Sequence, residues 1–328
     1  MARILVLGGT AWIGRSIAAG HVARGHEVVC LARAERGDAP GGAALLRADR
    51  DEARAYEAAA GDWDEVVDLT STPAHAASAV DALGDRARHW TFVSSVSAQR
   101  LEGAPEGADE DDPLVDEDPS GEDYGGAKAW IERMLQARLG DRLAIVRPGL
   151  VCGPGDGSDR FGYWPARAAL AGEGPLLVPA RDEPVQAIDV RDLVAFVVDV
   201  APTLVGVVNA TGPRTTLHEI VRLARAAAGR EAGTGALVLA DDVALDAAGV
   251  APWMGPGSLP LHLPASLATH AQRSSARYLA AGGRHTPLER TIADVLADER
   301  ERDIDRPRRS GLTRAEELAV IDSLASGA

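Results

Sequence analysis

The sequence predicts an α/β fold, with a doubly wound parallel sheet followed by a smaller C-terminal region. Short apolar runs alternate with helical patterns over residues 1–150, as in strands that are buried on both faces and joined by helices. A glycine-rich turn separates the first apolar run from the first helix. The 328 residues are 46% hydrophobic and 25% charged, which is ordinary for a globular protein with a large core.

Composition argues against several classes of protein. The net charge of -15 argues against a general nucleic-acid binder, which needs a basic face. The apolar regions are short or interrupted, so we expect no membrane span. Cys30 and Cys152 are the only cysteines and lie within or at the end of apolar runs. We therefore expect reduced thiols in a cytoplasmic protein, and in the absence of a His/Cys cluster we expect no metal site.

The first strand is expected at residues 3–7, and a helix that runs through Ala23 follows the glycine-rich turn. Free backbone N–H groups at such a helix N-terminus can accept a pyrophosphate. Alanine stands at the middle position of the usual three-glycine pattern; the alternative is a tight turn without a ligand. The predicted cofactor-binding residues of this turn are Gly8, Thr10, Ala11, Trp12, Ile13 and Gly14.

The second strand is expected at residues 26–31, and the residue after it selects the nicotinamide cofactor. Here Arg33 stands where an acid would accept a hydrogen bond from a free ribose 2′-hydroxyl, and Arg36 is close by. An arginine can hold a 2′-phosphate, so we expect NADP(H), with NAD(H) as the alternative because Glu35 is near. The other interpretation of Arg33 is a solvated loop charge.

Further strands are expected at residues 44–47, 65–69 and 89–93, with a helix after the first of them that reaches Ala60. Asp49 follows the first of these strands and either faces an adenine edge or caps that helix. Ligands of open α/β sheets gather at the carboxyl ends of the strands, which places Leu69 in the cofactor site. The serines after residue 93 either reach a bound oxygen or satisfy the loop backbone.

An acidic, proline-containing stretch at residues 102–118 is expected to form a surface excursion without a core and without chemistry. The helix after it begins near Asp123 and carries two apolar stripes. One stripe packs on the sheet. The other, with Trp130 and Met134, faces either a second subunit of a homodimer or more core.

Tyr124 and Lys128 lie four residues apart on this helix and so share one face. Lys128 is the only lysine in the chain, among arginines that cannot be deprotonated. A cation near a phenol favours phenolate and lowers the phenol pKa from about 10, as a general acid/base requires. The alternative is a surface helix on which the two residues are neighbours by accident. A last strand at residues 143–146 leads into Arg147-Pro148-Gly149-Leu150-Val151-Cys152-Gly153-Pro154-Gly155.

The motifs occur in a specific order: strand–G-G-T-x-x-x-G–helix, Ser95, Tyr124 with Lys128, and R-P-x-x-V-x-G-P-G. In this respect the chain resembles the extended short-chain dehydrogenase/reductases, the NAD-dependent epimerase/dehydratase family. Residues 186–193 and 282–289 look like later segments of that family, so the resemblance reaches about residue 300. It implies a Rossmann-type dinucleotide-binding domain in residues 1–150, to which residues 186–210 return, and a mainly substrate-binding region in residues 151–328.

The resemblance also implies roles for individual residues. Tyr124 would be the acid/base, Lys128 would bridge to the cofactor ribose and tune the phenol, and Ser95 would bind the substrate oxygen. Ser95 is preferred over its neighbours because the family's hydroxyl stands four residues before the position held here by Gln99. The cofactor positions carried over are Gly8, Ala11 and Gly14 at the pyrophosphate, Arg33 at the adenosine ribose, Asp49 at the adenine, and Pro148 and Val151 at the nicotinamide.

Two departures from the family pattern narrow the chemistry. Val96-Ser97 stands where sugar-nucleotide dehydratases have an Asp-Glu pair, which disfavours dehydration. Leu150 replaces an asparagine that helps to hold a nucleotide-sugar diphosphate, so such a substrate is also disfavoured. The candidate substrate-contacting residues are Ser97, Arg160 and Trp164, although the last two either line a substrate loop or only pack.

Residues 237–263 are expected to form part of a substrate lid, and residues 314–324 a solvated terminal helix. The leading hypothesis is an oxidoreductase that transfers hydride to or from a small carbonyl or alcohol, such as a sugar or a natural-product intermediate. The first alternative is a sugar or nucleotide-sugar epimerase that uses transient oxidation on the same residues. The second is a non-catalytic NAD(P)-binding regulator that keeps the fold.

Overall fold

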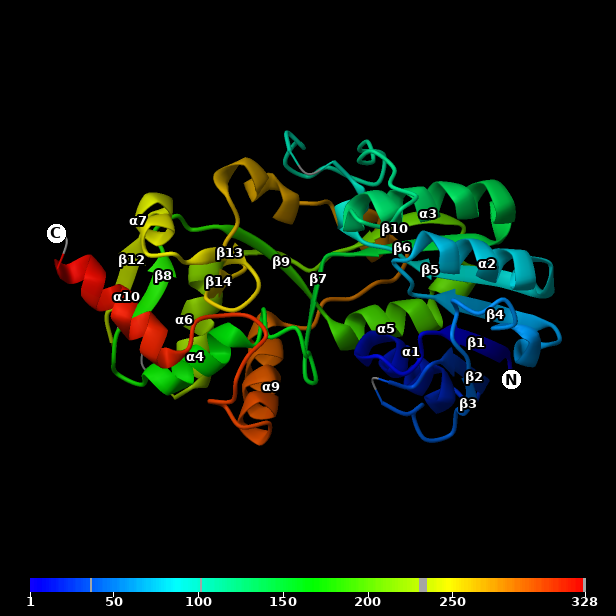
Figure 1. Ribbon diagram of the computed structural model, residues 1–328, viewed down its shortest axis with the longest axis horizontal. Coiled ribbons are helices and arrows are strands. Elements are labelled where there is room, and N and C mark those ends of the chain that lie inside the picture. The colour runs from blue at the N-terminus through cyan, green and yellow to red at the C-terminus, as the bar shows by residue number, and fades with distance from the viewer. Residues whose placement is uncertain (36, 101, 230–234, 327–328) are drawn as a thin grey trace. The chain divides into compact units, whose positions relative to one another are not determined.

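The computed structural model describes residues 1–35, 37–100, 102–229 and 235–326 (Figure 1). Arg36, named above beside Arg33, lies outside the described residues. The chain forms two compact units. Unit 1 comprises Met1–Val151, Val190–Gly212 and Arg273–His285, and unit 2 comprises Cys152–Asp189, Pro213–Gln272 and Thr286–Ala328. The segment that returns to unit 1 thus begins at Val190, four residues later than residue 186, and a second return follows at Arg273.

Unit 1 is built on a seven-stranded sheet with the strand order β10-β6-β5-β4-β1-β2-β3. All neighbouring strands pair in parallel, which confirms the predicted doubly wound α/β class. The strands are β1 (Arg3–Leu7), β2 (Glu27–Ala32), β3 (Ala44–Arg47), β4 (Trp63–Asp68), β5 (Ala87–Val93), β6 (Leu143–Pro148) and β10 (Gly206–Ala210). Each predicted strand is present within two residues of its expected ends.

Helices cover both faces of this sheet (Figure 1). Helices α1 (Trp12–Ala23) and α5 (Val190–Asp199) lie on one face, and α2 (Pro73–Leu83) and α3 (Tyr124–Leu139) on the other. The core under α2 and α3 contains Trp63, Trp90, Phe92, Ile131 and Leu135, all at most 1% exposed. Trp130 and Met134, on the second stripe of α3, are partly buried and pack against the same core.

The helix expected up to Ala60 is not formed. Turns occupy that stretch, with one short 3-10 helix, η1 (Glu57–Ala59). Alanine-rich sequence favours a helix, but tertiary contacts override this preference. The Tyr56 hydroxyl accepts a hydrogen bond from Arg50 Nε at 2.9 Å, and the Trp63 indole donates to the Ala59 carbonyl at 3.2 Å. These contacts hold the segment as a folded loop against the sheet.

The acidic stretch is not a simple excursion, because ion pairs attach it to unit 1. The Asp112 carboxylate accepts from Arg100 at 2.7 Å and from the fully buried Arg273 at 2.8 Å. Ala104 and Ala108 are buried, so the expectation that this stretch forms no core is wrong for these residues. Carboxylates of this stretch thus pair with arginines from other parts of the chain.

Unit 2 contains small sheets and several helices, and the chain enters it within β7 (Leu150–Cys152). β9 pairs with β11 antiparallel, while β8 with β12 and β13 with β14 pair in parallel. The expected lid, residues 237–263, contributes β12, α7, β13 and β14 to this unit. The remaining bounds are β8 (Leu176–Pro179), β9 (Pro184–Asp189), β11 (Arg214–Thr216), β12 (Leu237–Ala240), β13 (Ala251–Trp253), β14 (Ser258–Pro260), α4 (Tyr163–Ala171), α6 (Leu217–Ala227), α7 (Asp242–Ala247), α9 (Leu288–Glu301) and α10 (Arg314–Ser326), with the short α8 (Ala276–Ala280) in unit 1.

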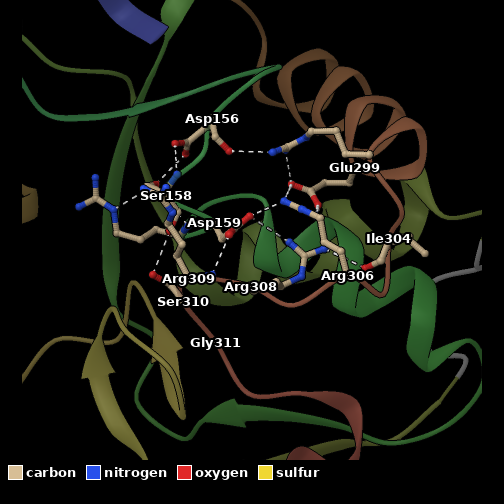
Figure 2. Close-up of polar contacts among 12 residues, drawn as sticks. Asp156, Ser158, Asp159, Glu299, Ile304, Arg306, Arg308, Arg309, Ser310 and Gly311 are labelled. Carbon is tan, nitrogen blue, oxygen red and sulfur yellow. Dashed lines mark hydrogen bonds and ion pairs between the residues drawn. The ribbon is translucent and has the colours of Figure 1, made fainter. Parts of the chain in front are cut away.

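The arginine-rich tail is part of unit 2 rather than a solvated appendage. The Glu299 carboxylate is fully buried and pairs with Arg302, Arg306 and Arg308 (Figure 2). In α10, the buried Glu317 accepts from the Leu177 backbone N–H at 3.0 Å. The predicted terminal helix is present as α10 and is largely exposed, but it is not simply solvated, because its buried side chains and the paired charges before it attach the tail to the unit.

Candidate active site

The glycine-rich turn has the geometry that a phosphate-binding turn requires. Gly8 adopts a φ of +94°, in the region that favours glycine. A Cβ added at Gly14 would lie 2.4 Å from the Gly8 carbonyl oxygen, so only glycine allows this approach of helix and strand. No side chain caps the N-terminus of α1 at Ala11, and backbone N–H groups at such a helix start can bind an anion.

The other predicted residues of the turn surround this N-terminus. Thr10 is buried, at 5% exposed, and Trp12 and Ile13 are half-buried. Gly9 packs on β2, where an added Cβ would lie 2.5 Å from the Sγ of Cys30. Burial raises the pKa of the Cys30 thiol to about 11, so this cysteine is a packing residue. The residues present therefore fit a dinucleotide pyrophosphate.

Arg33 is flanked by two carboxylates. Its guanidinium lies 3.1 Å from Glu35 and 3.8 Å from Asp49, and its side chain is 52% exposed. Asp49 also accepts from the Asp51 backbone N–H at 3.1 Å, in a turn rather than at the start of a helix. Arg33 and Asp49 thus lie together after β2 and β3, as predicted, but the carboxylates offset the positive charge there.

Lys128 is buried in α3, at 2% exposed, with its ammonium at the carboxyl ends of two strands. Nζ donates to the Thr70 carbonyl and to the Val93 carbonyl, both at 2.8 Å. Burial lowers the lysine pKa from 10.5 to about 8, while the charges of Asp68 and Glu132 oppose that shift. Within the described residues, these two bonds leave one N–H of the ammonium for a ligand.

Tyr124 is the first residue of α3, one helical turn before Lys128, and it is 51% exposed. The Asp123 side chain caps this helix by accepting from the Gly126 N–H at 2.5 Å. Asp118 in turn accepts from the Asp123 N–H at 2.7 Å. The end of the acidic stretch thus fixes the position from which the phenol emerges.

Ser95 lies after β5 and is 8% exposed. Its hydroxyl oxygen accepts from the Ser97 N–H at 3.1 Å, and its hydrogen can be donated to a ligand. A Cβ added at Gly125 would lie 2.4 Å from the Ser97 carbonyl oxygen, so the start of α3 packs directly on this loop. The structure therefore brings the segments that carry Ser95, Tyr124 and Lys128 together in unit 1.

Charged groups behind these residues were missed by sequence reasoning. Glu132 is fully buried and accepts from the equally buried Arg147 at 2.6 and 2.9 Å. Ser94 donates to the same carboxylate at 2.5 Å. Glu132 lies four residues after Lys128, and this spacing was the available signal. Asp68, at the end of β4, is likewise fully buried and accepts two hydrogen bonds from Arg50, each at 3.0 Å.

The other predicted cofactor residues, and Ser97, lie in several different strands and loops. Pro148 ends β6 and is buried beside Ala210 of β10, Val151 is 8% exposed, and Leu69 is half-buried after β4. Ser97 is half-buried in the loop that contacts α3.

The two substrate candidates in unit 2 differ in how they are placed. The Arg160 guanidinium lies 5.2 Å from the centroid of the Trp253 ring. Trp164 is fully buried, and its indole donates to the Pro260 carbonyl at 2.9 Å. That burial supports the packing alternative for Trp164.

Over the described ranges, no cluster of three or more His, Cys, Asp or Glu side chains could hold a metal ion. In the same part of the chain, no helix combines the length and apolar character that a membrane span needs. Both cysteines are buried and neither forms a disulfide, and the Cys152 thiol donates to the Ile188 carbonyl at 3.5 Å.

The chain is similar to known proteins in its sequence pattern and in its fold. The model of the NAD dependent epimerase/dehydratase family matches residues 4–209. A comparison with curated protein sequences finds no match.

Solved structures of three enzymes resemble the chain at 13–18% identity. UDP-glucose 4-epimerase of Thermus thermophilus, solved with NAD, has a TM-score of 0.66 at 18% identity and covers 91% of this chain and 99% of its own. UDP-N-acetylglucosamine 4-epimerase of Bacillus cereus has a TM-score of 0.68 at 16% identity, with coverages of 94% and 99%. UDP-glucuronic acid 4-epimerase of Bacillus cereus, also solved with NAD, has a TM-score of 0.63 at 13% identity, with coverages of 91% and 98%. The similarity to solved structures establishes the fold, and the family match covers more than half of the chain: the protein belongs to the NAD dependent epimerase/dehydratase family of enzymes.

Proposed function

We propose that the protein is an NAD-dependent epimerase that inverts a hydroxyl-bearing carbon of a sugar by transient oxidation. The observation that carries this proposal is the buried ammonium of Lys128, one helical turn from the exposed Tyr124 on a helix that packs against the Ser95 loop. The family match and the 4-epimerases of similar fold favour epimerisation over net oxidation or reduction. The net oxidoreductase favoured by the sequence becomes the second candidate.

Each of the three residues has a distinct task in this mechanism. NAD supplies a hydride acceptor and donor when it is bound. The Tyr124 phenolate would take the proton from the substrate hydroxyl and later return it to the same oxygen. Ser95 would donate a hydrogen bond to that oxygen, and the charge of Lys128 would stabilise the phenolate. Return of hydrogen to the other face of the carbon inverts the centre and leaves the cofactor unchanged overall.

The choice of cofactor depends on Arg33. A 2′-phosphate would have to compete with Glu35 and Asp49 for this guanidinium, and both carboxylates would repel it. We therefore favour NAD(H) over the NADP(H) expected from the sequence. Titration calorimetry with each cofactor decides: tighter binding of NAD supports this choice, whereas tighter binding of NADP, lost in Arg33→Ala, returns the choice to NADP.

The substrate test uses the sugars named for the similar enzymes. UDP-glucose, UDP-N-acetylglucosamine and UDP-glucuronic acid are incubated with the protein and NAD, and the C4 epimers are resolved by chromatography. Because Leu150 cannot hydrogen-bond a diphosphate as asparagine does, the corresponding free sugars and a range of other sugars form a second panel. An epimer formed without net change in absorbance at 340 nm supports the proposal.

Three results would each contradict the proposed epimerase mechanism in a different way. Net NADH formation or consumption that matches product would instead establish the oxidoreductase. NAD binding without turnover on either panel would favour the non-catalytic regulator. Tyr124→Phe should bind NAD normally while turnover falls by about 10²–10⁴-fold, and full turnover in this variant would remove the phenol from the mechanism.

A further inference from the structure

Asp68 lies at the carboxyl end of β4, on the strand next to the one that leads to Ser95. Its carboxylate is fully buried and accepts two parallel hydrogen bonds from the Arg50 guanidinium, each at 3.0 Å. The same carboxylate accepts from the Thr70 backbone N–H at 3.0 Å. A buried bidentate pair of this kind has a fixed geometry, so the turn at residues 68–70 is held in one conformation.

That turn presents a carbonyl group to the lysine. The Thr70 carbonyl oxygen accepts from Lys128 Nζ at 2.8 Å, while the Thr70 N–H is held by Asp68. Asp68 therefore fixes one of the two carbonyl groups that receive the ammonium. Arg50 lies in the loop after β3, next to Asp49, and it also donates to the His75 carbonyl of α2 at 2.8 Å.

The carboxylates and the aromatic ring around the Lys128 ammonium come from three elements. Asp68 approaches from β4, Glu132 from α3 itself, and the ring of Phe92 on β5 lies 4.6 Å from Nζ. Each carboxylate is paired with an arginine: Asp68 with Arg50, whose side chain is 10% exposed, and Glu132 with the buried Arg147. The ammonium thus lies between two carboxylates, each of which is already paired with an arginine. The protonation of Lys128 therefore depends on how fully each arginine neutralises its carboxylate.

We propose that Asp68, held by Arg50, is a positioning residue for Lys128. Asp68 orients the Thr70 carbonyl towards the Lys128 ammonium and sustains the positive charge of that ammonium. This inference rests on the proposed function, in which that charge stabilises the phenolate. The competing interpretation is a purely structural ion pair that holds the loop after β3. The two interpretations differ in what each variant should do to the titration of the lysine.

The single lysine allows a direct test. Protein labelled only at lysine with 13C at the ε carbon, and expressed without a lysine-containing tag, gives one side-chain resonance, which is that of Lys128. Its titration should have a midpoint near pH 8 in the wild type. Asp68→Asn removes a negative charge and leaves Arg50 unpaired, so the midpoint should fall by about one unit. Arg50→Met exposes Lys128 to an unneutralised carboxylate, so the midpoint should rise by about one unit.

The Lys128 midpoint is expected to shift in opposite directions in these two variants, and this difference distinguishes a positioning role from structural damage. Arg50→Lys keeps the cation but adds a second lysine resonance, which is identified from the double variant Arg50→Lys/Lys128→Arg. The remaining resonance, that of Lys128, should have a midpoint close to that of the wild type. Asp81→Asn is the matched control, because it removes the carboxylate partner of an arginine in an exposed pair, that of Arg138 on α3. This control should not move the resonance. Equal midpoints in Asp68→Asn and Arg50→Met, or shifts in the same direction, would overturn the inference.

The readout does not depend on turnover. If neither sugar panel reacts, the proposed function fails, while opposite shifts of the resonance still support the role of Asp68. If the enzyme is active, the alkaline limb of its kcat profile should move with the lysine midpoint in each variant. A limb that stays fixed while the midpoint moves would show that the charge of Lys128 does not govern turnover. If Asp68→Asn does not fold, the predicted rise in Arg50→Met decides alone.

Discussion

The Nζ of Lys128 lies 2.8 Å from the carbonyl oxygen of Val93, the last residue of β5 and two residues before Ser95. This bond joins the helix that carries Tyr124 to the strand that carries the serine loop. A buried ammonium is costly unless hydrogen bonds and nearby opposite charge compensate its lost hydration. Here two carbonyl groups and two carboxylates do so, which allows one side chain to be both a structural link and a titratable group.

Lys128→Met tests this double role. Methionine matches the length of the side chain but removes the charge and both hydrogen bonds. We expect turnover to fall by about 10²–10⁴-fold, because the phenolate loses its stabilising cation. Chemical denaturation should show a loss of about 1–3 kcal/mol, from two carbonyl groups left without a donor. Normal turnover with reduced stability would mean that the lysine is only structural.

Gly14→Ala should disrupt the pyrophosphate turn. The added Cβ would lie 2.4 Å from the Gly8 carbonyl oxygen, and backbone there cannot move without opening the turn. We expect at least about a tenfold loss of NAD affinity by calorimetry, equivalent to about 1.4 kcal/mol. Gly41→Ala is the matched control, since no atom lies within 4 Å of its added Cβ. Equal NAD affinity in the two variants would place the cofactor elsewhere.

Glu65 should make unit 1 less stable as the pH rises. Burial raises its pKa from 4.5 to about 7, so the folded state holds a proton that the unfolded state has lost between these values. The free energy of unfolding therefore falls with pH across this window. His21 acts in the opposite direction, because burial lowers its pKa from 6.5 to about 4 and stability rises over that range. Of these two groups, only Glu65 still contributes to the pH dependence above pH 6.5.

Glu65→Gln isolates this effect. The amide resembles the protonated carboxyl group and can still accept from the Thr91 hydroxyl, which lies 2.6 Å from the Glu65 carboxylate. Relative to the wild type, the variant should gain on the order of 3 kcal/mol between pH 4.5 and pH 8. Urea denaturation at several pH values measures the gain. An unchanged pH slope in the variant would assign the dependence to other groups.

The carboxylate of Glu299 should hold the C-terminal tail on unit 2. Glu299→Gln leaves Arg302, Arg306 and Arg308 with reduced compensation, and breaking a buried charge cluster costs about 3–5 kcal/mol. Faster tryptic cleavage after these arginines is the expected result. Glu301→Gln, at an exposed position of the same helix, is the matched control. Equal cleavage in both variants would mean that α10 alone anchors the tail.

Local patterns account for what could be predicted. Apolar runs bounded by glycines gave the strands because burial on both faces leaves a continuous signature, and the spacing of Tyr124 and Lys128 gave one face of α3. The same logic failed for residues 48–60, whose alanines favour a helix. There the Tyr56 and Trp63 side chains hold a folded loop instead, and no local rule encodes such contacts.

The ion pairs behind the site could not be read from spacing. Asp68 lies 18 positions from Arg50, and the Thr70 carbonyl lies 58 positions from Lys128, so only the folded sheet brings these groups together. The acidic stretch was misjudged for the same reason. Its composition is that of a solvated segment, and the arginines that neutralise it come from other parts of the chain.

Two of the arginines that pair with the acidic stretch, Arg273 and Arg277, arrive late in synthesis. Arg273 lies 161 positions after Asp112, and Arg277 lies 166 positions after Asp111. While the nascent chain emerges from the ribosome, Asp111 lacks Arg277 and Asp112 has only Arg100 until most of unit 2 has been translated. We therefore expect the dinucleotide-binding unit to reach its final form only at the end of translation, although its first strand is among the first segments to leave the exit tunnel.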